Sequence, residues 1–202
     1  MITIVDYGMG NLGSILNMFK CIGAKATVSS DPEHILKAEK ILLPGVGAFG
    51  NAMARIDAIG VREALNDVAL QKKIPTLGIC LGMQLLTDSS EEGGGVSGLG
   101  WISARTVRFE LPASFKVPHM GWNRVLLTQP SALTDGLADE PRFYFVHSYY
   151  VKVVEERHSI LKADYGVQFD AAIQRDNIFG AQFHPEKSHR FGMKLLENFV
   201  SI

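Results

Sequence analysis

The chain has 202 residues, of which 47% are hydrophobic and 20% charged, close to ordinary usage in globular proteins. It contains 20 Lys and Arg residues and 21 Asp and Glu residues, so it has no excess of basic charge to neutralise phosphates. Nucleic acid is therefore not expected as a partner. A chain of this length can bury a large core, which predicts a single domain over residues 1–202.

The termini and cysteines indicate the compartment. Residues 1–6 carry no basic segment and reach an acidic residue at once, unlike a signal peptide. No apolar run approaches the ~20 residues of a membrane helix. Cys21 and Cys80 are the only cysteines, and Cys21 is expected in the core on the apolar face of a helix. We therefore expect a soluble, cytoplasmic protein with no disulfide and no membrane contact.

The first predicted elements are a strand over 2–6 and a helix that ends near Gly23. Between them, residues 8–13 match G-x-G-x-x-G, and Asp31 follows at about the spacing of the acidic residue in dinucleotide-binding folds. A dinucleotide-binding module using Gly8–Gly13 is therefore one alternative. The other is a tight strand–helix turn, in which Asn11 caps the helix or contacts a partner.

Strands and helices then alternate. The expected elements are a strand at 25–29, a short helix starting at Asp31-Pro32, a strand at 40–43 that ends in Pro44-Gly45-Val46-Gly47, and helices at 49–59 and 61–72. This alternation predicts a mostly parallel sheet with right-handed crossovers. In such sheets the functional site lies at the carboxyl ends of the strands.

Residues 74–86 form the central motif. A short apolar strand leads into Gly78-Ile79-Cys80-Leu81-Gly82 and an apolar-faced helix, which is the strand–nucleophile–helix elbow with sulfur in place of a serine hydroxyl. Gly78 and Gly82 lack Cβ atoms and permit close packing around Cys80. The helix N-terminus would stabilise a thiolate, and the Leu81 N–H would face a developing oxyanion. The alternative is that Cys80 is a small buried residue.

In the second half of the chain, the predicted elements are mainly short strands. Residues 89–98, with Glu91-Glu92 and three successive glycines, are expected to form a flexible acidic loop. Short strands follow at roughly 101–109, 120–127, 142–146, 149–154, 159–165 and 170–174, then a strand at 178–182 and a helix near 190–200. We expect these strands to extend the sheet and to add an antiparallel layer.

The last strand leads to His184-Pro185-Glu186. A nucleophilic cysteine needs a base, and the base needs a third group to orient it. In an extended chain His184 and Glu186 would project to the same side, and Pro185 favours that geometry. The sequence therefore predicts Cys80 as nucleophile, His184 as base and Glu186 as the group that orients it.

Other polar groups are candidates for the same site. Val46 and Gly47 end a neighbouring strand and would supply the second oxyanion donor. Gln84 lies one helical turn after Cys80 and would contact the substrate, or else be a solvated polar side chain. No cluster of His and Cys has the spacing of metal ligands, so no metal is expected.

The motifs at Cys80 and His184 resemble those of the class I (triad-type) glutamine amidotransferases. Four further blocks are similar to the glutaminase subunits of imidazole glycerol phosphate synthase, from histidine biosynthesis: residues 6–11, 43–47, 118–123 and 145–149. The resemblance runs from residue 6 to Lys187 and implies a flavodoxin-like α/β fold. One departure is Thr87, where the family pattern suggests an aromatic residue.

The resemblance implies hydrolysis of L-glutamine to glutamate and ammonia through a cysteinyl thioester, without a cofactor. The ammonia would pass to a cyclase subunit, a (βα)₈ barrel, within a heterodimer that makes imidazole glycerol phosphate and aminoimidazole-carboxamide ribotide. Ser148 and Tyr149 match the strand that holds the α-groups of glutamine, and Trp122 lies in a segment that the family uses at its partner interface, although such an aromatic is as often in the core. Lys187, directly after Glu186, is a candidate for the interface because the rim of the site must face whatever receives ammonia, and Asn11 is a further candidate. The glutaminase would be nearly idle until the partner binds, with a backbone flip at Pro44–Gly47 on activation.

Three alternatives stay open. The first is a partner-independent triad cysteine hydrolase, which would be fully active alone. The second is the glutaminase subunit of pyridoxal phosphate synthase, against which the Pro118–Asn123 block speaks. The third is the dinucleotide-binding module, which leaves the elbow and the His-Pro-Glu segment unexplained.

Overall fold

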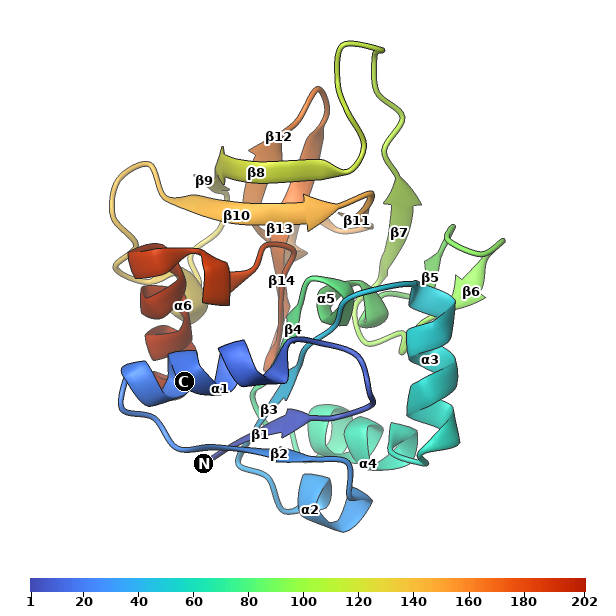
Figure 1. Cartoon of the computed structure of the whole chain (residues 1–202), viewed down its shortest axis with the longest axis vertical. Helices are drawn as coiled ribbons and strands as arrows, with labels where there is room; N and C mark the ends of the chain where they lie inside the picture. Colours follow the sequence, from blue (N-terminus) through green and yellow to red (C-terminus); the bar gives the residue numbers. More distant parts are fainter.

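The computed structural model describes all 202 residues, and five parallel strands form its centre (Figure 1). In spatial order they are β2 (Ala26–Ser29), β1 (Ile2–Val5), β3 (Lys40–Leu43), β4 (Thr76–Ile79) and β14 (Ile178–Ala181). All but the edge strand β2 are almost wholly buried, as expected for parallel strands covered on both faces.

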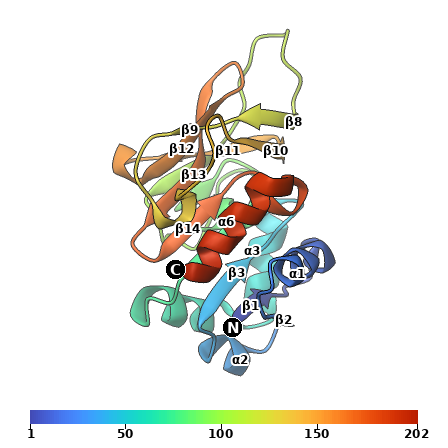
Figure 2. The same cartoon turned by 90° about the vertical axis from the view of Figure 1, so that its left-hand side faces the viewer.

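Helices cover both faces of this parallel region. One face packs against α1 (Leu12–Cys21) and α6 (His189–Ser201), which lie to the left in Figure 1 and towards the viewer in Figure 2. The other face packs against α2 (Pro32–Leu36), α3 (Phe49–Ala58), α4 (Arg62–Asn66), the π-helical turn η1 (Asp67–Gln71) and α5 (Leu81–Leu85). The result is a three-layer α/β arrangement.

Beyond β14 the large sheet continues mainly antiparallel. Its further strands are β13 (Gln168–Arg175), β11 (Tyr149–Val153), β7 (Ala104–Arg108), β5 (Ser89–Ser90) and β6 (Val96–Ser97), with β12 (Ser159–Asp164) and β9 (Leu126–Leu127) branching from β13. Short 3-10 turns occur at η2 (Ala132–Thr134), η3 (Glu156–His158) and η4 (Pro185–Lys187).

A separate two-stranded antiparallel sheet crosses the carboxyl edge of the parallel strands (Figure 1). It pairs β8 (His119–Arg124) with β10 (Arg142–His147). Tyr144 of β10 ties it to the segment after β14, because its carbonyl accepts the His184 N–H at 2.9 Å and its N–H donates to Ser188 Oγ at 3.0 Å. The small sheet therefore forms a fixed wall above the ends of β3, β4 and β14.

The expected fold class is confirmed, and two local expectations are wrong. Cys21 is exposed, because it follows the buried Phe19 by two residues and so lies on the opposite side of α1. The segment 89–98 contains the β5–β6 hairpin, and its Glu92 carboxylate accepts the Phe49 N–H at 2.7 Å. No helix combines the length and the apolar character needed to cross a bilayer.

Candidate active site

Cys80 occupies a strained turn between β4 and α5. Its φ of 53° and ψ of −108° lie in a region that L-residues rarely adopt, and its side chain is only 6% exposed. The neighbouring glycines are required by space: a Cβ on Gly82 would lie 1.8 Å from the carbonyl oxygen of Leu43, and one on Gly78 would lie 2.5 Å from that of Gly82. The elbow therefore holds the sulfur through backbone packing.

His184 and Glu186 meet behind the cysteine. His184 Nδ1 lies 2.8 Å from Glu186 Oε1, and both side chains are about 95% buried, with 5% and 4% exposed. The expected geometry differs in one respect. Glu186 lies in the 3-10 turn η4 and not in extended chain, so the turn, and not strand alternation, directs its carboxylate to the imidazole.

The electrostatics favour a protonated His184. Burial alone would lower the pKa of His184, but hydrogen bonds with Cys80 and Glu186 and their negative charges outweigh burial and raise the pKa to about 10. Glu186 Oε2 is buried and has no hydrogen-bond partner, so the carboxylate is stabilised mainly through its contact with His184. A cysteine thiolate beside an imidazolium is the reactive form expected of a nucleophilic thiol.

Two glutamines hold the position of the sulfur: Gln182 contacts it, and Gln84 contacts Gln182. Gln182 is fully buried and donates through Nε2 to Cys80 Sγ at 3.8 Å, while its Oε1 accepts from Gln84 Nε2 at 3.1 Å. Gln84 Nε2 also donates to the Tyr149 carbonyl at 3.0 Å, so only its Oε1 remains for a ligand. Gln182 was not predicted, although a polar residue directly after the apolar run 178–181 and two before His184 is a usable signal.

A cleft of about 360 Å³ opens over the cysteine. It is lined by Val46, Gly47, Cys80, Leu81, Gln84, Glu92, Pro118, Val146, His147, Ser148, Tyr149, His184 and Lys187. These include every predicted oxyanion and substrate residue. Glu186 lies behind His184, and Asn11 and Trp122 lie outside the cleft lining.

Four lining residues were not predicted for the cleft: Glu92, Pro118, Val146 and His147. Val146 is next to the sulfur, since its carbonyl lies 3.9 Å from Cys80 Sγ. Glu92 reaches the cleft from the hairpin that was expected to be a flexible loop, and it is the only carboxylate of the lining. Its position also depends on the contact with the Phe49 N–H, which lies 43 residues away in the chain and which no local pattern encodes.

The segment after β3 is fixed at one end and free at the other. The Tyr7 hydroxyl donates to the Pro44 carbonyl, and a Cβ on Gly45 would lie 2.5 Å from the Tyr7 oxygen. By contrast, Val46 is 46% exposed and Gly47 has a φ of 104°. The backbone at Val46–Gly47 is therefore the part of this loop with room to change.

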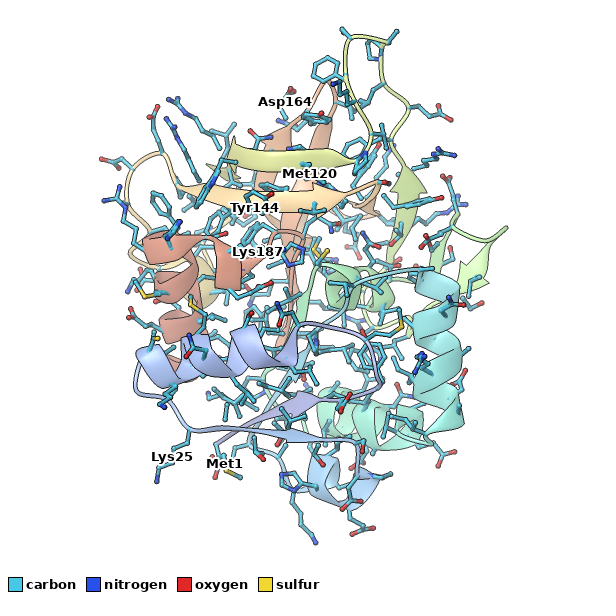
Figure 3. The ribbon with its side chains drawn as sticks, in the orientation of Figure 1. Met1, Lys25, Met120, Tyr144, Asp164 and Lys187 are labelled. Carbon is cyan, nitrogen blue, oxygen red and sulfur yellow. The ribbon has the colours of Figure 1, made fainter.

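The residues predicted for a partner surface lie in different surroundings. Trp122 is 47% exposed and stacks on His189 with ring centroids 5.5 Å apart. The Lys187 ammonium lies 5.8 Å from the centre of the Tyr144 ring, and Figure 3 shows both residues where β10 crosses the molecule. Asn11 is exposed and caps α1, because its side chain accepts the Ser14 N–H at 3.3 Å.

The acidic residue that follows the G-x-G-x-x-G segment 8–13 has a structural role. Asp31 caps α2 by accepting the Glu33 N–H at 3.0 Å, which accounts for its position after the second strand. No group of three or more His, Cys, Asp or Glu side chains is arranged to hold a metal ion. That the chemistry needs neither cofactor nor metal stays a prediction.

Comparisons with known proteins show the family of the chain. The family model described as glutamine amidotransferase class-I matches residues 3–202. The chain is 53% identical over 200 residues to imidazole glycerol phosphate synthase subunit HisH 2 of Methanococcus maripaludis, covering 99% of this chain and 98% of that protein. It is 48% identical to the subunit of the same name from Pseudomonas aeruginosa, over the full length of both.

Solved structures show the same fold at lower identity. A crystal structure of a glutamine amidotransferase aligns with a TM-score of 0.77 at 16% identity, covering 100% of this chain and 98% of that one. PurLQS from Thermotoga maritima aligns with a TM-score of 0.74 at 16% identity, covering 99% and 97% of the two chains.

Proposed function

Because the chain belongs to the class I glutamine amidotransferase family, we propose that Cys80, His184 and Glu186 are the triad with which it hydrolyses L-glutamine. It functions as a glutaminase subunit of an imidazole glycerol phosphate synthase in histidine biosynthesis, together with a partner subunit in a heterodimer. The observation that carries the proposed triad is the buried contact of His184 with Glu186 beside the strained Cys80.

The first step forms a thioester. The Cys80 thiolate attacks the side-chain carboxamide carbon of glutamine, and the carbonyl oxygen becomes an oxyanion held by the N–H of Leu81 and one from Val46–Gly47. The imidazolium of His184 gives its proton to the departing nitrogen, so that ammonia leaves as the C–N bond breaks. The raised pKa of His184, about 10, keeps this proton available at neutral pH.

The second step releases glutamate. His184, now neutral, takes a proton from water as the water oxygen attacks the thioester carbon. The C–S bond then breaks, which regenerates the Cys80 thiolate and the His184 imidazolium. Glu186 holds the imidazole orientation and stabilises its charge in both steps.

The cleft offers complementary groups to the α-end of glutamine. An α-ammonium group needs an anion, and Glu92 is the only carboxylate of the lining. The backbone of Ser148 and Tyr149, which also line the cleft, is proposed to bind the α-carboxylate. Gln84 Oε1 is the remaining acceptor for the carboxamide N–H groups.

We further propose that the partner is a cyclase with a (βα)₈ barrel that consumes the ammonia. Lys187 at the cleft rim, exposed Trp122 and Asn11 are candidates to contact it. The Tyr7–Pro44 contact leaves Val46–Gly47 free to turn, which supports a peptide flip there when the partner binds. Both cysteines are free thiols, which is compatible with a single-domain enzyme of the cytoplasm.

The test is glutamate release by wild type and by Cys80→Ala, each with the cyclase subunit, its acceptor substrate and glutamine. Wild-type turnover is expected to fall by at least about 10⁴-fold in the variant. Ammonia-dependent synthesis by the same complex is the control, because it bypasses the glutaminase and reports intact assembly. Glutamate release near the wild-type rate would rule out Cys80 as nucleophile.

A further inference from the structure

Two histidines outside the triad lie buried side by side at the cleft, where His147 is part of the lining and His119 packs against it. His119 of β8 is opposite His147 of β10 in the strand register, and their rings are joined by a contact of 2.9 Å from His119 Nδ1 to His147 Nε2. They are only 3% and 5% exposed, among the rings of Phe109, Phe145 and Phe169. The reaction steps above use neither histidine.

Their hydrogen bonds fix both tautomers. His147 Nδ1 lies 2.8 Å from the Tyr149 carbonyl, which can only accept, so Nδ1 carries the proton and Nε2 is an acceptor. His119 Nδ1 must then donate to that nitrogen. The remaining His119 Nε2 is an acceptor facing Asn123 Nδ2 at 3.4 Å, and Asn123 also donates to the Asp164 carbonyl at 2.8 Å.

The hydrogen bonds between these residues therefore run in one direction, from His119 on β8 through His147 to the lining of the cleft. They end on the Tyr149 carbonyl, which also accepts from Gln84 Nε2 at 3.0 Å. Two donors from different elements thus hold one peptide oxygen. On the other side of His147, the Val146 carbonyl lies 3.9 Å from the Cys80 sulfur.

We propose that His147, kept neutral and in the Nδ1–H tautomer by His119, is a positioning residue that sets the Ser148–Tyr149 backbone for the α-groups of glutamine. The proposal rests on the glutaminase function proposed above. In a charged His147, Nε2 would carry a proton and face the Nδ1–H of His119, so the hydrogen bond between the two rings would be lost. A charged His147 would also add a cation near the imidazolium of His184.

The surroundings favour the neutral forms. Burial lowers the pKa of His119 to about 4. Burial also lowers the pKa of His147 to about 3; the Tyr149 carbonyl opposes this shift, and His119 and His184 add to it. At neutral pH both rings are therefore uncharged, as the tautomer argument requires.

The kinetic test compares four variants in complex with the cyclase subunit. His147→Leu removes the donor to Tyr149, and His119→Leu removes the donor to His147. His147→Asn and His119→Asn each keep a side-chain N–H close to the position of Nδ1. For the Leu variants we expect KM for glutamine to rise about tenfold or more with kcat changed by less than about threefold, and for the Asn variants a KM within about threefold of wild type.

Ammonia-dependent synthesis is the control for folding and assembly in each variant. If it is intact and KM in His147→Leu equals the wild-type value, the positioning role is wrong. If kcat falls while KM is unchanged, it is also wrong. These outcomes differ from failure of the proposed function, in which Cys80→Ala would keep releasing glutamate.

A second measurement decides the matter if the Leu variants lose ammonia-dependent synthesis. The full chain is labelled with ¹⁵N in histidine, and long-range ¹H–¹⁵N correlation spectra are recorded at pH 7.5. The proposal expects His119 and His147 both protonated on Nδ1 with bare Nε2 nitrogens. An Nε2–H tautomer or an imidazolium at either position would overturn it.

Discussion

The parallel region and the two-stranded wall hold the two sides of the active site by different means. In the parallel region, Cys80 is fixed by backbone packing, since the glycines at 78 and 82 leave no space for a side chain. On the other side, His147 of the wall and Gln84 donate side-chain hydrogen bonds to the carbonyl of Tyr149, the first residue of β11. A nucleophile needs one rigid position, whereas a backbone segment held by side-chain hydrogen bonds can be adjusted by changing those side chains.

The largest expected effect is on the triad itself. Glu186→Gln keeps the shape of the side chain but removes the charge that orients His184, and kcat for glutamine hydrolysis should fall by about 10⁴-fold. Ammonia-dependent synthesis should remain, because it does not use the triad. Glutaminase kcat within tenfold of wild type would contradict the role of Glu186.

Glu186→Gln should also change the pH dependence of glutamine hydrolysis. Protonated His184 donates its proton to the departing nitrogen, and with its pKa raised to about 10 the rate should fall as the pH rises through that value. Because Glu186 is one of the two groups that raise this pKa, Glu186→Gln should move the alkaline fall of kcat/KM to lower pH. The check is a pH profile of residual glutaminase activity from pH 7 to 10.5. An unmoved alkaline limb would show that Glu186 does not act on His184.

Gly82→Ala tests the backbone packing of the parallel region. Its Cβ would lie 1.8 Å from the carbonyl oxygen of Leu43, so the strand and helix must separate, and we expect a loss of about 4 kcal/mol or more in the free energy of unfolding. Gly13→Ala is the matched control, because a Cβ there meets nothing within 4 Å inside α1. Urea unfolding should show Gly13→Ala unchanged or stabilised by up to about 1 kcal/mol. Equal stability of the two variants would contradict the account.

The wall should respond to acid. His119 and His147 have folded-state pKa values of about 4 and 3, below the ordinary value of 6.5. Between pH 6.5 and these lower values, the unfolded protein therefore binds more protons at these residues than the folded protein does. Their contribution to stability is complete above pH 6.5 and is lost progressively as the pH falls from 6.5 to the folded-state values. Each histidine adds a slope of up to about 1.4 kcal/mol per pH unit.

Urea unfolding of wild type and His119→Asn at pH 7, 6 and 5 measures this slope. The variant has one buried histidine fewer, so its stability should decline less steeply with acid than that of the wild type. Identical slopes would mean that His119 is not held neutral in the folded state.

The smallest predicted effect concerns the hydrogen bond from Gln182 to the sulfur of Cys80. Gln182→Leu removes the donor to Cys80 and leaves one Gln84 N–H unpaired, which should cost about 1–3 kcal/mol of stability and lower glutaminase kcat/KM by about tenfold. Gln174→Leu is the control, since that side chain bonds only the Asp176 carbonyl, far along β13 from the cleft. Equal kcat/KM in the two variants would show that the Gln182 contact is without effect.

The same comparison explains what sequence could predict. The elbow and the His-Pro-Glu segment are local patterns, so the parallel sheet and the residues around Cys80 followed from spacing. The position of Glu92 depends on its contact with the Phe49 N–H, and the His119–His147 contact depends on the register of β8 and β10. Both contacts join segments far apart in the chain. Cys21 was misjudged because an apolar residue near a helix end was assigned to the buried face without regard to its angular position.

The central claim is that the buried Cys80, and not the exposed Cys21, is the nucleophile. The most direct measurement incubates the complex with a diazoketone analogue of glutamine and maps the alkylated cysteine by mass spectrometry. We expect one adduct, on the peptide containing Cys80, that forms more slowly when glutamine is added and is absent in His184→Ala. An adduct on Cys21 alone, or labelling of Cys80 that glutamine does not slow, would contradict the account.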